Sequence, residues 1–377
     1  MKKILFIFGT RPEAIKMIPI IKGLEKNKKI SYEICITAQH REMLDQVLEL
    51  FEIKVDYDLN IMKKNQDLFD ITATILLQLK SILQQSQPDI VLVHGDTTTT
   101  FTAALASFYL QIKVAHIEAG LRTNNLSSPF PEEANRQLTS RIANFHFAPT
   151  LASSKNLQAE NIDMKKVFVT GNTVIDALHL VNHKIQNSQA LQEKLYKIVA
   201  KNGYKMNERR FILVTGHRRE NFGEGFKNIC RALQKLASNN LDIDIVYPLH
   251  LNPNVKDIVH HYLDNIGNIY LISPQEYEPF IYLMSKSHII LTDSGGIQEE
   301  APSLGKPILV MRNTTERPEA VKAGTVKLVG TNIDKIVNFS QELLDDKQIY
   351  DTMSKIQNPY GDGKASKRII DILTKVL

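Results

Sequence analysis

A stretch of small, acidic and basic residues at positions 292–320 has the residue types and spacing that could hold a nucleoside diphosphate. It follows the apolar run 289–291 and begins with Thr-Asp-Ser-Gly-Gly, after which two adjacent glutamates and a later arginine follow. Glycine lets a backbone approach a ligand closely, and the free N–H groups at the start of the next helix attract phosphate. The pattern therefore predicts a strand, a phosphate-binding turn, a short helix ending at Gly305 and a second strand.

Charged side chains in the same stretch extend this prediction to a nucleotide. Glu299 and Glu300 fall within the first turns of the expected helix, where a carboxylate can accept hydrogen bonds from both hydroxyls of a ribose. Arg317 lies in the loop after the second strand and offers another group for an anion. An ordinary strand–turn–helix with a helix-stabilising acid is the competing interpretation, which Gly-Gly alone would favour.

Two cations lie near the start of the chain, where they could hold a diphosphate or a departing phosphate. Gly-Thr-Arg-Pro follows the first apolar run, so that Arg11 precedes a helix opened by Pro12, and Lys16 lies about one turn inside it. Guanidinium and ammonium groups at a helix start can bind phosphate oxygens. The alternative is a solvated basic face of the helix.

Three carboxylates at the ends or starts of expected elements form a possible general acid–base set. Asp96 follows the run 90–94, Glu118 ends the next strand and precedes Ala-Gly, and Glu132 lies in the first turn of a helix opened by Pro131. Mutual repulsion and burial would raise the pKa of some of them toward neutrality. The alternatives are that Asp96 caps a helix, and that Glu132 only complements a helix dipole.

Three further candidates follow strands in the second half of the chain. His217 ends the run 211–215 and precedes two arginines, so it could contact a pyrophosphate or assist its departure. Gln275 and Phe280 follow another strand and could read and pack against a base. A plain loop histidine, and an ordinary loop with a core phenylalanine, are the alternatives.

The elements that must position these residues are short apolar runs alternating with longer amphipathic ones, which is typical of α/β units on parallel sheets. We predict strands in the first half at 4–8, 32–37, 90–94, 114–118, 145–148 and 167–170, and in the second half at 211–215, 243–247, 269–272, 289–291, 307–311 and 326–329. In open α/β sheets, ligands lie outside the carboxyl ends of the strands, which is where the candidates fall.

Chain length and composition suit two Rossmann-like domains facing a cleft. We predict an N-terminal domain at 1–180 that carries the acids, a nucleotide-binding domain at 181–365, and a C-terminal helix at 366–377 that packs back on the first domain. The segment 182–210 is polar and is expected to be a helix and a connection.

Several classes of protein are disfavoured by the composition. A net charge of +5 over 377 residues, with no basic run, does not indicate nucleic-acid binding. No apolar stretch is long enough for a membrane span. No metal-ligand motif, P-loop or GxGxxG fingerprint is present, so we expect neither metal nor cofactor. Cys35 and Cys230 are scattered and are expected to be reduced core residues, which suits the cytoplasm.

The stretches TDSGGIQEEAPSLGKP, MRNTTERPEAV, GTRPEAIK and NPYGDG together resemble the non-hydrolysing UDP-N-acetylglucosamine 2-epimerases of bacteria, over essentially the whole chain. The resemblance implies the GT-B architecture and interconversion of UDP-GlcNAc and UDP-ManNAc, which supplies units for surface polysaccharide. It implies anti elimination of UDP to give 2-acetamidoglucal and re-addition of UDP after protonation on the opposite face. It also implies a homodimer.

By motif match, the resemblance assigns a role to each candidate. Proton handling falls to Asp96, Glu118 and Glu132, and stabilisation of departing UDP to His217 and Arg11. Glu300 is expected to hold the ribose. Ser294, Gly295 and Gly296 are expected to hold the phosphates. The remaining residues that correspond to the family's binding or catalytic positions are Lys16, Gln275, Phe280 and Arg317. Which acid removes the C2 proton stays open.

One departure from relatives concerns a second nucleotide sugar that activates some of them. Gln39-His40-Arg41 is kept here, but Glu42 and Asn65 replace the expected Gln and Arg, and an acid beside a diphosphate is unfavourable. Three other functions remain open: a GT-B glycosyltransferase that uses a UDP-sugar, a hydrolysing epimerase that releases ManNAc and UDP, and a non-catalytic UDP-sugar sensor. Retention of Asp96, Glu118 and His217 disfavours the sensor.

Overall fold

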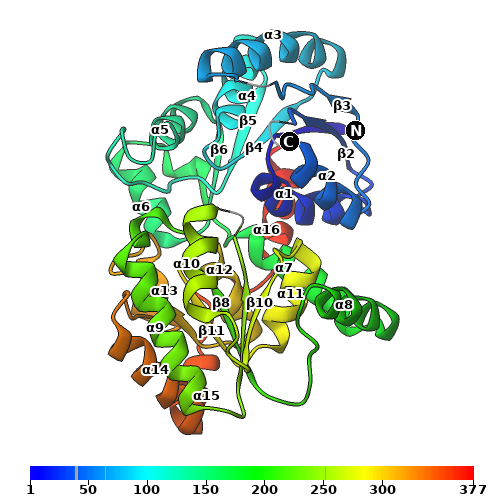
Figure 1. The fold of residues 1–377 in the computed structure, drawn as a ribbon. Helices are drawn as coiled ribbons and strands as arrows, with labels where there is room; N and C mark the ends of the chain where they lie inside the picture. The colour runs from blue at the N-terminus through cyan, green and yellow to red at the C-terminus, as the bar shows by residue number, and fades with distance from the viewer. Residues whose placement is uncertain (39–40, 64, 251) are drawn as a thin grey trace. The chain divides into compact units, whose positions relative to one another are not determined.

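The computed structural model describes residues 1–38, 41–63, 65–250 and 252–377, with the backbone alone of Asn254. The chain divides into two compact units, Met1–Ala177 with Gly361–Leu377 (unit 1) and Leu178–Tyr360 (unit 2). The chain passes from the first unit to the second within helix α7 (Thr173–Gln186). Each unit contains a parallel sheet with helices, drawn in Figure 1.

Unit 1 has a seven-stranded parallel sheet in the order β3-β2-β1-β4-β5-β6-β7. Its strands are β1 (Lys2–Phe8), β2 (Ile30–Ile36), β3 (Tyr57–Asp58), β4 (Ile90–His94), β5 (Lys113–Ile117), β6 (Phe145–Ala148) and β7 (Val167–Val169). Its helices are α1 (Arg11–Leu24), α2 (Arg41–Leu50), α3 (Leu68–Ser86), α4 (Thr98–Tyr109), α5 (Glu132–Ile142), α6 (Leu151–Ala159), the 3-10 turn Met164–Lys166, the start of α7, and α16 (Ala365–Val376).

Unit 2 has a six-stranded parallel sheet in the order β10-β9-β8-β11-β12-β13. Its strands are β8 (Phe211–Thr215), β9 (Asp244–Pro248), β10 (Ile269–Ile272), β11 (Ile289–Thr292), β12 (Ile308–Val310) and β13 (Val326–Leu328). Its helices are α8 (Gln189–Lys201), α9 (Glu224–Asn239), α10 (Pro253–Leu263), α11 (Tyr277–Lys286), α12 (Gly295–Glu300), α13 (Pro318–Ala323), α14 (Ile333–Asp345) and α15 (Lys347–Ser354), with 3-10 turns at Arg219–Asn221 and Ala301–Leu304.

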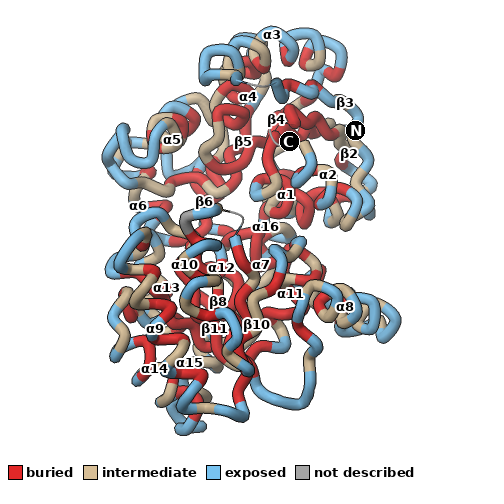
Figure 2. The backbone as a smooth tube through the Cα atoms, viewed as in Figure 1, coloured by how far each residue is buried: buried red, intermediate tan, exposed pale blue. Residues whose placement is uncertain are grey.

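Apolar strands buried on both faces explain why the sheets are parallel. Every side chain from Ile4 to Phe8 is buried, as is every one from Ile289 to Thr292, and Figure 2 shows these central strands in red. Parallel strands need helical crossovers that cover both faces of the sheet, so the strands read as continuous apolar runs. Fully burying one aliphatic side chain contributes about 1.5–3 kcal/mol, so these runs anchor each unit.

The last helix completes unit 1. Helix α16 packs on α1, where a Cβ at Gly23 would lie 2.4 Å from Cδ1 of Ile370, so a larger residue there would require the end of the Ile370 side chain to move. The carboxylate of Asp176 accepts the N–H groups of Ala365 (3.2 Å) and Ser366 (2.8 Å) at the start of α16. The C-terminal residues therefore belong to the same compact unit as the first strand.

The predicted α/β class with two Rossmann-like units, the pair that defines the GT-B architecture, is confirmed. The expected helix and connection at 182–210 correspond to α8 and the segment 202–210, although the first residues of that range, 182–186, still belong to α7. The two-residue strand β3 was not predicted, because it has no apolar run. Gln39 and His40 lie outside the described residues, while Arg41 pairs with Asp45 (2.8 Å) and with Asp58. Among the described helices, none is long and apolar enough to cross a membrane.

Each sheet has one place where the strand order reverses. In unit 1 it lies between β1 and β4, and in unit 2 between β8 and β11. At each such place, the loops that follow the two neighbouring strands run to opposite faces of the sheet. This leaves a crevice where α/β proteins bind ligands. Most of the predicted site residues lie in or near these loops.

Candidate functional site

The loop after β1 is shaped by glycine and a buried carboxylate. A Cβ at Gly9 would lie 2.1 Å from Oγ1 of Thr37 and 2.6 Å from Oγ1 of Thr99, so no side chain fits there. Thr10 caps α1 in a capping box with Glu13. Arg11 is the first residue of α1 and is partly exposed.

Glu13 ties this loop to the loop after β4. Its Oε2 accepts the N–H groups of Gly9 (3.1 Å) and Thr10 (2.8 Å) and the Thr10 hydroxyl (2.8 Å). Its Oε1 accepts the hydroxyls of Thr97 (2.7 Å) and Thr100 (3.2 Å). Burial raises the pKa of Glu13, against these hydrogen bonds, which lower it. The loops that carry Arg11 and Asp96 are thereby held together.

Glu118 lies at the centre of a buried polar cluster at the carboxyl ends of β4 and β5. Its carboxylate pairs with Lys16 Nζ and accepts from Asn172 Nδ2 at 3.0 Å, and its Oε2 lies 3.7 Å from Nε2 of His94. Glu118 adopts a left-handed φ of 62°, which costs a non-glycine residue of order 1 kcal/mol or more. Such strain is typical of a side chain aimed for function rather than for stability.

His94 is held neutral beside this carboxylate. Burial lowers its pKa to about 4, although the charge of Glu118 raises it, and Lys16 lowers it further. Its Nε2 is buried and has no hydrogen-bond partner among the described residues. His94 and Asn172 were not among the predicted site residues. Polar side chains at strand ends were the available signal, since His94 ends β4 and Asn172 follows β7 closely.

Asp96 is paired with a cation from α5. Nε and Nη2 of Arg136 bond to Oδ2 of Asp96 at 2.9 and 2.6 Å, and Nη1 of Arg136 bonds to Glu133 at 3.0 Å. Burial and the charge of Glu118 raise the pKa of Asp96, while Arg136 and Lys16 lower it, and the net shift is upward. A carboxylate whose pKa is raised in this way is a stronger base than an ordinary aspartate, which suits a group that accepts a proton. Arg136 was also missed, because forty positions separate it from Asp96 in the sequence.

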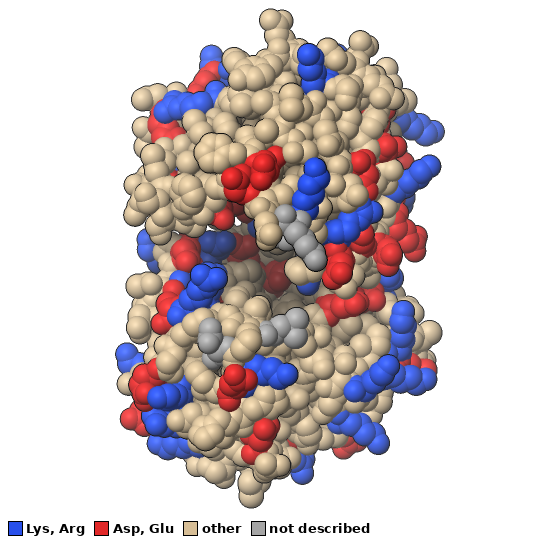
Figure 3. All heavy atoms as spheres, turned by 45° about the horizontal axis from the view of Figure 1, so that its top comes forward, with Lys and Arg blue, Asp and Glu red and all other residues tan. Residues whose placement is uncertain are grey.

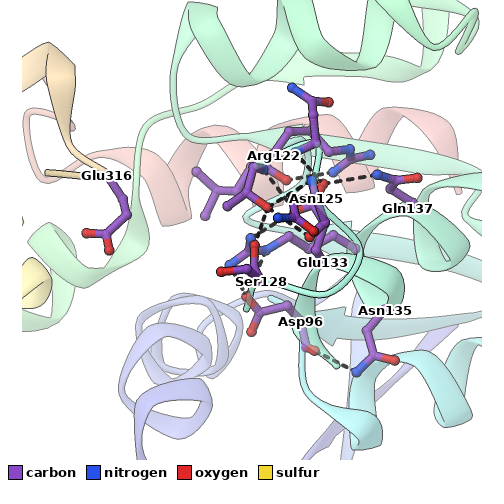
Figure 4. A network of polar contacts seen from close by, with 12 residues as sticks. Asp96, Arg122, Asn125, Ser128, Glu133, Asn135, Gln137 and Glu316 are labelled. Atoms are coloured by element: carbon purple, nitrogen blue, oxygen red, sulfur yellow. Dashed lines mark hydrogen bonds and ion pairs between the residues drawn. The ribbon is translucent and has the colours of Figure 1, made fainter. Parts of the chain in front are cut away.

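Figure 4 shows how the neighbouring network holds α5 and the loop before it. Glu133 accepts the N–H groups of Thr123 (3.0 Å) and Asn124 (3.1 Å) and the side-chain amide of Gln137 (3.0 Å). Although burial raises the pKa of Glu133, these hydrogen bonds lower it overall. Glu133 is therefore a structural anion that fixes the start of α5.

Glu132, the neighbouring predicted acid, has a different environment. It is the first residue of α5 and is partly exposed, and its Oε2 is buried without a hydrogen-bond partner among the described residues. The structure thus brings Lys16, Asp96 and Glu118 into one electrostatic cluster. It places Glu132 one residue before Glu133, whose partner Arg136 also binds Asp96.

In unit 2, the loop after β8 closes on Asp293. A Cβ at Gly216 would lie 2.8 Å from the hydroxyl of Tyr247, so glycine is needed where the loop crosses that ring. Oδ2 of Asp293 accepts the N–H groups of His217 (2.9 Å) and Arg218 (2.8 Å). His217 stacks on His250, with ring centroids 5.2 Å apart and 16° between the planes.

Two guanidinium groups face the start of α12. A Cβ built on Gly295 would lie 3.7 Å from Nη2 of Arg218 and 4.0 Å from Nη2 of Arg317. Ser294 precedes α12 and is partly exposed, and Gly296 is exposed. Backbone N–H groups beside two arginines form an arrangement that can bind a diphosphate.

The two glutamates of α12 have different partners. Glu299 is buried and pairs with Arg317, so it holds that arginine. Glu300 is also buried and accepts the hydroxyl of Tyr277 at 3.2 Å. A second arginine, Arg312, joins the loops after β8 and β12 by pairing with Glu220 and Glu316. Arg312 is 4% exposed and was not predicted from the sequence.

Gln275 and Phe280 lie at the β10–α11 connection. Nε2 of Gln275 donates to the carbonyl of Ser273 at 2.6 Å, and its Oε1 accepts from Asn202 at 3.4 Å. Phe280 belongs to the first turn of α11 and is half-buried. Both therefore lie close to the carboxyl end of β10, in unit 2.

Metal-ligand residues, over the described part of the chain, and surface charge, over the face drawn in Figure 3, are two further features that bear on a site. Among the described residues, no group of three or more His, Cys, Asp or Glu side chains could hold a metal. Figure 3 shows lysine and arginine interspersed with aspartate and glutamate on the face in view. Within each unit, chemistry-bearing side chains gather at the carboxyl ends of the strands.

Two Rossmann-like units, one with a cluster of acids and one with glycine, arginine and glutamate at a strand–helix turn, define a class of nucleotide-sugar-binding α/β proteins. A family model described as UDP-N-acetylglucosamine 2-epimerase matches residues 22–374. The chain belongs to this UDP-N-acetylglucosamine 2-epimerase family.

Individual relatives match over nearly the full length. The UDP-N-acetylglucosamine 2-epimerase of Campylobacter jejuni is 60% identical over 375 residues, which cover 99% of this chain and 98% of the relative. The enzyme of the same name from Escherichia coli strain K12 is 56% identical over 371 residues, with 98% of each chain covered. A crystal structure of the Neisseria meningitidis UDP-GlcNAc 2-epimerase bound to UDP-GlcNAc has a TM-score of 0.89 at 56% identity and covers 99% of this chain and 100% of that one.

Proposed function

We propose that the chain interconverts UDP-N-acetylglucosamine and UDP-N-acetylmannosamine by the non-hydrolysing route. A base removes the proton at C2, the C1–O bond breaks, and UDP departs with its electron pair, which leaves 2-acetamidoglucal. A proton is then delivered to the opposite face of C2, and the UDP oxygen attacks C1. The reaction is balanced without water, metal or redox cofactor.

One observation carries this proposal: Lys16, Asp96 and Glu118 form an electrostatic cluster at the carboxyl end of the unit 1 sheet. The raised pKa of Asp96 and the left-handed backbone of Glu118 support proton chemistry at this cluster. Because the C2 proton is only weakly acidic, its removal also needs assistance from the departing diphosphate. The family relationship and the relative bound to UDP-GlcNAc support the same substrate.

We assign Asp96, Glu118 and Glu132 to proton transfer, and Lys16 to the charge balance of Glu118. In unit 2, the geometry around α12 supports phosphate binding by Ser294, Gly295, Gly296 and Arg317. Glu300 is assigned to the ribose, and Gln275 and Phe280 to the base. His217 and Arg11 are assigned to the departing UDP, since an imidazole and a guanidinium can both stabilise the growing negative charge.

Proton NMR of UDP-GlcNAc with the protein in D2O tests this function. We expect UDP-ManNAc to form, deuterium to enter C2 of both sugars, and no net UDP to accumulate. Stoichiometric UDP with free ManNAc would show a hydrolysing epimerase instead. Binding without any reaction would contradict the epimerase and favour a glycosyltransferase awaiting an acceptor.

We also infer that the protein is a homodimer. We further infer that it works in the cytoplasm, where its product supplies ManNAc units for surface polysaccharide. Support for the dimer comes from large apolar side chains that α3 and α4 leave exposed: Phe69, Leu77, Phe108 and Tyr109 are 84%, 73%, 59% and 64% exposed. Light scattering of the wild type and of Phe69→Asp tests this. The wild type is expected at twice the chain mass of 42.8 kDa, and a monomeric wild type would contradict the proposal. The buried thiols of Cys35 and Cys230 suit a reducing compartment.

A further inference from the structure

Asp293 is a buried carboxylate that no predicted role includes, although it lies inside the phosphate-binding motif. It follows β11 directly and is 0% exposed. An acid at this place would repel a diphosphate if its charge faced the ligand. The structure shows where the charge is directed instead, which is toward the loop after β8.

One oxygen of Asp293 is fully occupied. Oδ2 accepts the N–H groups of His217 and Arg218 at 2.9 and 2.8 Å, and Nδ2 of Asn221 at 3.3 Å. The same Asn221 nitrogen donates to the carbonyl of Met311 at 3.1 Å, so three loops meet at this carboxylate. Backbone N–H groups cannot accept hydrogen bonds, so Oδ2 must remain an acceptor in any variant that keeps this geometry.

The other oxygen faces the ring of His217. Oδ1 is buried, has no hydrogen-bond partner among the described residues, and lies 3.5 Å from Nδ1 of His217. A buried carboxylate oxygen without a donor destabilises the folded state, because the water it has lost is not replaced by a hydrogen bond. A proton on Nδ1, with a small rotation of the ring, would relieve that cost.

The ring of His217 stacks on that of His250, with centroids 5.2 Å apart, and the backbone N–H of His217 is held by Asp293. With Nδ1 directed at the carboxylate, Nε2 is the remaining ring nitrogen that a ligand can meet. The side chain is 38% exposed, so that nitrogen can be reached from solvent.

We propose that Asp293 is a positioning residue that holds the proton on Nδ1 of His217 and stabilises its imidazolium form while the diphosphate leaves. This inference rests on the proposed function, in which His217 contacts the departing UDP. As C1–O cleavage proceeds, negative charge grows on the diphosphate, and Nε2–H of a cationic His217 can donate to it. Asp293 compensates the positive charge from the far side of the ring.

The charges around His217 determine the expected effect of pH. Burial lowers the pKa of His217, the Asp293 carboxylate raises it, and His250 and Arg218 lower it, with a net lowering. Asp293 is thus the charge that opposes the other three influences. Without it the pKa of His217 would fall further, and the protonated form would be lost at a lower pH.

Asp293→Asn is the first test. Its oxygen can still accept the N–H groups of His217 and Arg218, so its NH2 group is directed at Nδ1 and reverses the tautomer of the ring. We expect kcat to fall about 100-fold or more, since the same change in a catalytic aspartate–histidine pair costs up to ~10⁴-fold. The KM for UDP-GlcNAc should change far less, and the alkaline limb of the kcat profile should move to lower pH.

A double-mutant cycle separates positioning from folding. If Asp293 acts through His217, adding Asp293→Asn to His217→Gln should lower kcat no further. An equal further loss in that background would overturn the proposal. Asp264→Asn is the matched control, because it breaks an aspartate–histidine pair with His260 (2.9 Å) on the surface of α10 in the same unit. It should leave kcat unchanged.

The tautomer of the unmodified protein provides a test that does not depend on the folding of any Asp293 variant. In ¹⁵N-histidine NMR of the full chain, with His217→Gln used for assignment, neutral His217 should carry its proton on Nδ1. A proton on Nε2 would overturn the proposal. Wild-type turnover by His217→Gln would overturn both this inference and the assigned role of His217, whereas loss of turnover there with an unchanged Asp293→Asn would overturn this inference alone.

Discussion

Unit 1 and unit 2 each hold a buried carboxylate where the strand order of their sheet reverses, and the two carboxylates have different surroundings. Glu13 comes from the helix after the first strand of its sheet, and Asp293 from the loop after β11. Both accept the backbone N–H groups of the loop that follows the first strand. Each therefore ties two loops that carry predicted site residues.

The difference lies in what the second oxygen meets. In Glu13 it accepts two threonine hydroxyls, which do not titrate. In Asp293 it lacks a hydrogen-bond partner among the described residues and faces the imidazole of His217. A carboxylate with both oxygens satisfied rigidifies its site, whereas one with an unsatisfied oxygen beside a titratable ring can change that ring's protonation. We infer that unit 1 places its proton chemistry elsewhere, at Glu118 and Asp96.

The largest effect should come from Glu118→Gln. Removing a catalytic acid or base typically costs 10²–10⁴-fold, so we expect kcat to fall about 1000-fold. Calorimetry should show UDP affinity within about twofold of the wild type, because all the residues assigned to UDP except Arg11 lie in unit 2. Glu25→Gln, on the exposed end of α1, is the control and should leave both values unchanged. A parallel loss of UDP affinity would contradict the division of labour between the units.

Glu300→Gln should lower the affinity for UDP, which Glu118→Gln is expected to leave unchanged. Hydrogen bonds to a charged group contribute about 1.5–3 kcal/mol, so UDP affinity should fall roughly 10- to 100-fold. The same titration with UMP should show the same loss, because the ribose is shared. If the affinity for UDP stays at the wild-type value, Glu300 does not hold the ribose.

Glu13→Gln tests whether Glu13 has a structural role, in contrast to the role proposed for Asp293. Its oxygen can keep the N–H groups of Gly9 and Thr10, but the charge-assisted bonds to Thr97 and Thr100 are weakened. We expect the free energy of unfolding to fall by about 2 kcal/mol in denaturant titrations. The alkaline limb of the kcat profile should not move, in contrast to Asp293→Asn. A shift of that limb would show that the two carboxylates are not different in kind.

Arg136→Met should give the smallest effect of these variants. We expect it to move the pH dependence of kcat. Burial raises the pKa of Asp96 and Arg136 lowers it, so removing the guanidinium should raise it further. The limb of the kcat profile that Asp96 controls should therefore move to higher pH. Arg136→Lys keeps a charge and should shift less. Movement to lower pH would be inconsistent with the Asp96–Arg136 pair.

Much of the fold followed from local pattern. Predicted strands at 4–8, 211–215 and 289–291 lie within β1, β8 and β11, because continuous apolar runs are what a strand buried on both faces requires. The boundary between the units was harder to place. It lies between Ala177 and Leu178, inside α7, where an uninterrupted helix gives no change of composition.

Some residues of the candidate site could likewise be predicted from local sequence, and others could not. Asp96, Glu118 and His217 could be singled out because each follows a strand in a polar motif. Arg136 could not, since it lies inside a helix and reaches its partner Asp96 over 40 positions of sequence. Asp293 had a local signal, an acid within a predicted phosphate-binding turn, but its orientation toward His217 depends on the loop after β8.

The amino-acid sequence by itself determined the alternation of strands and helices, the turns that need glycine, and the presence of acids and cations after strands. These features depend on neighbours along the chain, through backbone sterics and the periodicity of burial. The tertiary structure alone decided which carboxylate meets which cation and which stays without a hydrogen-bond partner. Such pairing depends on distances between side chains far apart in sequence, and electrostatic energies change steeply with those distances and with burial.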